Sequence, residues 1–87
     1  METLKRSAQL DVQAVEDFVR AQGKTVEDLL LWHDEVMTTN EDGMLAIIQA
    51  EQTRAGVVWI VTDLLDTGWM IENSFLPDGT IKRQKTR

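Results

Sequence analysis

The sequence predicts an α+β fold, with about three N-terminal helices followed by a small antiparallel β meander. Between residues 11 and 55, apolar side chains recur at the three- and four-residue spacing of a helix face. Residues 57–61 break that pattern, because they form a β-branched and aromatic run typical of a strand. A Pro-Asp-Gly turn at residues 77–79 then separates two further extended segments.

Each of the three helices is placed by a residue that can cap it. Asp11 can begin a helix that Gly23 ends, and Thr25 can begin a second helix that runs to about residue 39. Asn40 is a plausible N-cap of a third helix, which fades by residue 56. On this interpretation, the whole chain between residue 11 and the extended run is helical.

The meander is predicted from three extended segments. Residues 57–61 indicate a strand that is buried on both faces, residues 69–76 a second strand, and residues 80–82 a short edge strand. An alternative stays open, in which residues 57–61 continue the third helix. The fold would then be mostly α, with a C-terminal hairpin.

Length and composition indicate one small domain. The 87 residues divide into a flexible N-terminus at 1–10, a single globular domain at 11–81 and a basic, flexible tail at 82–87. The absence of Cys from the sequence excludes a disulfide scaffold, a thiolate zinc site and a thiol nucleophile. Because no segment approaches the ~20 apolar residues that span a bilayer, we expect a cytoplasmic protein without membrane contact.

The sequence offers no catalytic, cofactor-binding or metal-binding site. His33 is the single His and lacks a second ligand at helical spacing, and the five Gly are isolated rather than gathered in a phosphate-binding loop. Asp66-Thr67-Gly68 resembles the active-site tripeptide of retroviral-type aspartic proteases. That chemistry needs two such carboxylates, and too little chain follows the tripeptide to complete that fold. We therefore interpret it as a turn and predict a non-enzymatic protein without a cofactor.

Acidic residues dominate the sequence and recur in pairs. The formal net charge is −6, from 15 Asp and Glu against 9 Lys and Arg. Three acidic pairs recur every seven residues, which on a helix returns to nearly the same face. Two large apolar residues lie among them, as an interface anchor lies inside a polar rim. The predicted partner-binding residues are Glu27, Asp28, Leu31, Trp32, Asp34, Glu35, Glu41 and Asp42.

These features predict a small acidic protein that binds and regulates or inhibits a larger protein with a basic surface. Such a protein would be antitoxin-like, immunity-like or phage-antagonist-like, and its acidic helical surface could mimic nucleic acid. The acidic stripe could also be an ordinary solvated face. One alternative is a nucleic-acid accessory protein that uses the tail residues Lys82, Arg83, Lys85 and Arg87. A second alternative is a structural subunit of a homo-oligomer, such as a homodimer, which the apolar strand and the three Trp could serve.

Overall fold

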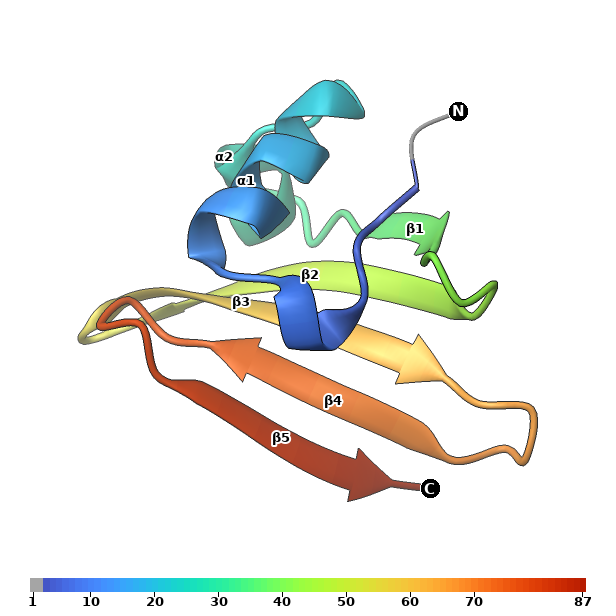
Figure 1. Ribbon diagram of the computed structural model, residues 1–87. Coiled ribbons are helices and arrows are strands. Elements are labelled where there is room, and N and C mark those ends of the chain that lie inside the picture. Colours follow the sequence, from blue (N-terminus) through green and yellow to red (C-terminus); the bar gives the residue numbers. More distant parts are fainter. Residues whose placement is uncertain (1–2) are drawn as a thin grey trace.

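The computed structural model describes residues 3–87 as a two-layer α+β fold (Figure 1). Two short helices lie on one face of a five-stranded antiparallel sheet, whose strands pair in chain order. The elements are the 3-10 turn η1 (Ser7–Gln9), the helices α1 (Val12–Ala21) and α2 (Val26–Leu31), and the strands β1 (Val36–Thr39), β2 (Leu45–Thr53), β3 (Gly56–Leu64), β4 (Met70–Phe75) and β5 (Ile81–Thr86). No helix within residues 3–87 has the length and apolar character needed to cross a membrane.

The prediction of three helices before a small meander is wrong, and so is the mostly α alternative. The second helix ends at Leu31 rather than near residue 39, and the region of the third helix forms the β1–β2 hairpin. The reason is a tight turn that begins at Asn40, whose Oδ1 accepts hydrogen bonds from the N–H groups of Asp42 and Met44. Gly43 adopts a positive φ of 80° in this turn, a conformation that disfavours side chains with a Cβ.

The two helices do begin where their capping residues predict. Asp11 Oδ1 accepts a hydrogen bond from the N–H of Ala14 at 2.7 Å and caps α1. Thr25 and Asp28 form a reciprocal capping box at the start of α2. Satisfying the free N–H groups at each helix start explains why such short helices form here.

The core lies between the helices and one face of the sheet. Side chains on this covered face alternate along the strands with side chains on an open face, which carries no helix (Figure 1). In β3, Trp59 and Val61 are buried, whereas Val58 and Ile60 on the open face are only half-buried. The predicted strand at 57–61 therefore exists, but it is not buried on both faces. The largest fully buried side chains are Leu4, Val15, Val19, Leu29, Ile48, Val61, Asn73 and Phe75.

Near both ends of the described chain, the backbone pairs with the sheet. Leu4 is 1% exposed, and its backbone pairs with Thr39 and Glu41 along the outer edge of β1. At the other end, Ile81–Thr86 forms β5 beside β4, where we had predicted a flexible tail from residue 82. Each of these two segments pairs with a strand edge that would otherwise be open.

Candidate functional site

The acidic pairs of the predicted surface lie on three different segments of the chain, not on one helix. Glu27 and Asp28 lie in the first turn of α2, while Asp34 and Glu35 lie in the segment between α2 and β1. The third pair, at 41–42, lies in the turn after β1. The continuous helical stripe is therefore wrong, because the helix that was to carry it ends at Leu31.

Several of these carboxylates already have partners within the chain. Asp34 Oδ2 lies 3.0 Å from the Nζ of Lys24, and Asp42 Oδ1 lies 2.7 Å from the Nε of Arg6. In each case the hydrogen bond, followed by the charge of the carboxylate, raises the pKa of the basic partner. Asp28 is engaged in the capping box of α2. These pairs reduce the negative charge that the region presents to a partner.

The two apolar residues of the predicted site are strongly exposed. Leu31 ends α2 and is 68% exposed, and Trp32 follows as its C-cap and is 74% exposed. On the same short helix, Leu29 is fully buried against the sheet. Because successive residues of a helix point about 100° apart, a helix that packs through Leu29 must direct Leu31 outward.

His33 fixes the direction of the chain after Trp32. Its φ is 56°, and it is the one residue other than Gly with a positive φ among residues 3–87. The left-handed conformation costs about 1–2 kcal/mol for a residue with a Cβ. It turns the chain back, so that the N–H of Asp34 donates to the carbonyl oxygen of Asp28 at 3.2 Å. We call Leu31, Trp32 and His33 the α2 knuckle.

A shallow hollow of about 470 Å³ adjoins the α2 knuckle. Leu30 and His33 line one side of it, and residues 49–52 of β2 line the other. It lies where β2 extends past β1, since the pairing of β1 with β2 stops at Val36 and Ile48. The knuckle is therefore beside a concave surface rather than on a flat one.

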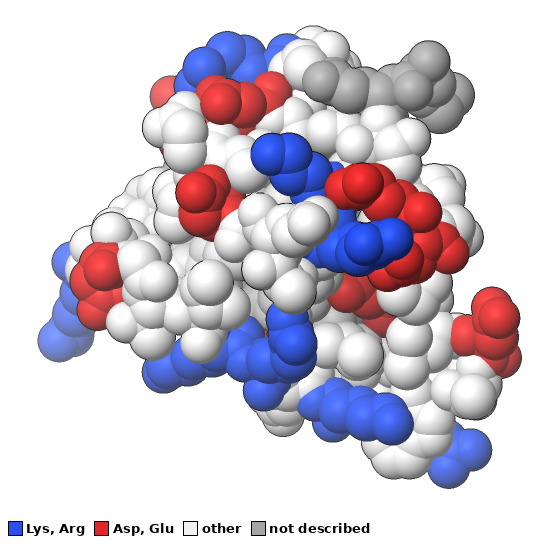
Figure 2. Space-filling model, viewed as in Figure 1, with Lys and Arg blue, Asp and Glu red and all other residues white. Residues whose placement is uncertain are grey.

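The four basic residues assigned to the tail are brought together along β5. Figure 2 shows Lys and Arg side chains along the lower edge of the molecule, over this strand. Lys85 Nζ and Arg87 Cζ lie 5.3 and 5.0 Å from the ring centroid of Trp69, within the range of cation–π contacts. Arg83 Nε donates a hydrogen bond to Asn73 Oδ1 at 2.8 Å.

Trp69 and Asn73 are residues that the sequence analysis did not assign to this site. Trp69 was considered only as one of three Trp that could serve a homo-oligomer, and Asn73 was not considered. Once the Pro-Asp-Gly turn is accepted, the hairpin register places residue 83 opposite 73 and residue 85 opposite 71. Taken together, the turn and the hairpin register could have predicted these contacts.

A buried polar cluster joins the N-terminal segment to the sheet. Asp63 is 4% exposed, and its Oδ2 accepts hydrogen bonds from the hydroxyl of Ser7 and from Asn73 Nδ2. The other carboxylate oxygen, Oδ1, has no hydrogen-bond partner. His33 lies in the turn after α2 and is not part of this cluster. Within residues 3–87, no group of three or more acidic or His side chains is arranged to hold a metal ion.

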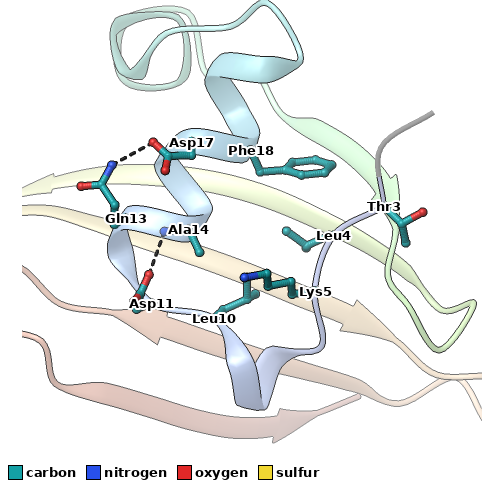
Figure 3. Close-up of a pocket in the computed structure, with 9 residues that line it drawn as sticks. All are labelled: Thr3, Leu4, Lys5, Leu10, Asp11, Gln13, Ala14, Asp17 and Phe18. Atoms are coloured by element: carbon teal, nitrogen blue, oxygen red, sulfur yellow. Dashed lines mark hydrogen bonds between the residues drawn. The ribbon is translucent and has the colours of Figure 1, made fainter.

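A second hollow, of about 400 Å³, lies between the N-terminal segment and α1 (Figure 3). Leu4 and Phe18 form part of its wall, and Lys5 extends across it toward the helix. Its two carboxylates already have local roles. Asp11 caps α1, and Asp17 accepts a hydrogen bond from Gln13 at 2.8 Å. These two carboxylates therefore stabilise α1.

Comparison with known proteins places this chain in no established group. No family model matches it, and no curated protein or solved structure matches it either.

Proposed function

We propose that this chain is a non-enzymatic binding protein that docks on a larger protein partner through the α2 knuckle. The observation that carries the proposal is the exposure of two adjacent large apolar side chains, Leu31 at 68% and Trp32 at 74%. Large aromatic residues that anchor interfaces contribute much of the binding energy, and adjacent exposed apolar side chains can form such an anchor. Binding there would regulate or inhibit the partner by covering its surface.

The surroundings of the knuckle define the chemistry of the partner. Glu27 and Glu35 are exposed near it, and Asp34 is only partly neutralised by Lys24. The whole chain also carries a net charge of −6. A complementary partner therefore has an apolar pocket for Trp32 with Lys or Arg side chains at its rim, which speeds association at low salt.

The test compares which proteins are captured by the tagged wild-type chain and by a Leu31→Ala/Trp32→Ala variant. Met37→Ala is the matched control, because Met37 is 62% exposed but lies on the open face of the sheet. We expect one stoichiometric partner that survives nuclease, is retained by the control and is lost by the double variant. Each Ala at a true anchor should weaken binding about 30-fold or more. Capture of the same partner by all three proteins would overturn the proposal.

A second candidate function, a structural subunit of a homodimer, is favoured by the open face. Leu45, Leu64 and Met70 lie side by side across three strands, and Met37 pairs with Ile47 in the next row. Exposed apolar patches of this kind commonly mark protein interfaces. Sedimentation equilibrium over a hundredfold concentration range tests it, and a Leu64→Lys variant should shift the protein toward monomer. A wild-type chain that is monomeric throughout contradicts this candidate.

A further inference from the structure

The last strand leaves its outer side open. β5 pairs with β4 on one side, and among residues 3–87 no segment pairs with it on the other. Five of its six residues are exposed. The N–H of Leu76 donates to the carbonyl oxygen of Thr80, which sets the hydrogen-bonding alternation of the hairpin. Because hydrogen-bonded and non-hydrogen-bonded pairs alternate from that bond onward, the backbone N–H and C=O groups of Ile81, Arg83 and Lys85 point away from β4.

Three of the four cations on this edge contact side chains of the same chain. Charged residues on an edge strand normally prevent unwanted pairing between copies, and that role needs no fixed side-chain position. Here Asn73 holds Arg83, and the ring of Trp69 holds Lys85 and Arg87. Side chains that are already ordered lose less conformational entropy when they bind a ligand. The arrangement is therefore that of a binding surface as well as a protected edge.

We propose that the β5 edge receives an extended acidic segment of a partner protein as a sixth strand. The segment would bond through its main chain to the outward N–H and C=O groups of residues 81, 83 and 85. Its carboxylates would meet Arg83, Lys85 and Arg87 on the helix side of the sheet and Lys82 on the open side. Ile81, which is 49% exposed, would contact an apolar residue of the segment.

The geometry favours a peptide over the other possible occupants. A second copy would place Arg83 and Lys85 against the same residues of its own β5, and like charges directly opposite one another are destabilising. Nucleic acid would meet the cations but would leave the strand's alternating donors and acceptors unused. The ring of Trp69 is also engaged by two cations, which a base would have to displace in order to stack where they lie.

This surface is separate from the α2 knuckle. The helix α2 packs against β2, near the β1 edge, while β5 lies at the opposite end of the strand order. The inference therefore does not depend on the proposed function. A failure of one leaves the other testable with its own variants.

The first test uses a fluorescent eight-residue peptide of alternating Glu and Val with blocked termini, measured by anisotropy against the full chain. Two N-methylated versions carry the methyl groups on alternate sets of residues. In strand addition, the backbone N–H groups of only one of these two sets face β5. The version methylated on that set should bind at least about tenfold more weakly than the parent peptide, and the other version should bind nearly as well as the parent. Equal affinities for both versions would overturn the proposal.

The second test compares two variants of one residue. Lys85→Gln removes the charge, whereas Lys85→Pro removes the charge and the outward N–H without breaking a bond to β4. We expect a several-fold weakening for Lys85→Gln that fades at high salt, and a further loss of about tenfold for Lys85→Pro. Circular dichroism checks that both variants fold. If Lys85→Pro does not fold, the N-methylated peptides still decide the question.

Two further results would also overturn the proposal. If the acidic peptide binds no better than a version with Gln in place of Glu, the cations act only to protect the edge. If a single-stranded oligonucleotide binds more tightly than the peptide and binds both Lys85 variants equally, the surface recognises nucleic acid through charge alone.

Discussion

At the β1 edge of the sheet the N-terminal segment partly covers the backbone through a bridge at Leu4, whereas the β5 edge is left open and is surrounded by cations. Leu4 pairs with the β1 edge and is buried, and Arg6 is bonded to Asp42 beside it. On β5, Ile81 is half-exposed and no segment of the described chain pairs beyond it. Both arrangements prevent uncontrolled strand pairing. The covered edge adds to stability, and the charged edge remains available to a partner.

The largest difference between the edges should appear when an apolar residue is truncated at each. Leu4→Ala should lower the free energy of unfolding by about 2–4 kcal/mol, because it leaves a cavity in the core. Ile81→Ala should lower it by less than about 1 kcal/mol, since half of that side chain is already in water. Urea unfolding of both variants measures the contrast. Similar losses would mean that the two edges contribute equally to stability.

A smaller effect is expected where the N-terminal segment is bonded to the buried cluster. Ser7→Ala removes a donor from Asp63, whose other oxygen already lacks a partner. We expect a loss of about 1–3 kcal/mol. Ser74→Ala is the control, with a change within about 0.5 kcal/mol, since Ser74 lies on the open face. A loss at Ser7 no larger than at Ser74 would show that this bond does not hold the segment.

The β5 edge should show its own, weaker coupling to the core. Arg83→Ala leaves the Oδ1 of Asn73, a fully buried residue, without its donor and should cost about 1 kcal/mol. Lys82→Ala, on the opposite face of the same strand, should change stability little. Comparing the thermal unfolding midpoints of these two variants distinguishes a cation that is held by Asn73 from one that is only solvated. Equal midpoints would indicate that Asn73 does not hold Arg83.

The smallest effect concerns the turn that leads into β5. The backbone N–H of Thr80 donates to Asp78 and lowers the pKa of that carboxyl. Because the folded pKa lies below the unfolded one, the stabilisation is present above the unfolded pKa and is lost as the pH falls through the folded pKa. The urea midpoint of the wild type should therefore be higher than that of Asp78→Asn at neutral pH. The difference between the two midpoints should disappear in acid. A gap that is independent of pH would contradict this assignment.

Local patterns were enough to predict part of the fold. The β-branched run at 57–61, the Pro-Asp-Gly turn and the caps at Asp11 and Thr25 each specify their element through contacts a few residues apart. The β1–β2 hairpin was missed because its apolar residues fit both a helix and a strand spacing. Gly43 lies within the segment predicted as the third helix, although it occupies the tight turn between the strands.

The candidate sites were predicted less well than the turns, because they depend on distant pairing. The sequence did single out Leu31 and Trp32, and both are exposed. It could not show that Leu4 covers β1, since that contact joins residues far apart in the chain. The contact of Lys85 with Trp69 likewise depends on the β4–β5 register and has no local signal.

The order of the strands has a consequence for how the chain folds. Every strand pairs with its neighbour in sequence, so the sheet can grow by successive hairpins that each close a short loop. The N-terminal segment is different, because Ser7 forms hydrogen bonds with Asp63 and Asn73, which follow it in the sequence by 56 and 66 positions. Those contacts must wait until β3 and β4 are paired. Substitutions at Ser7 should therefore speed unfolding while leaving the folding rate nearly unchanged.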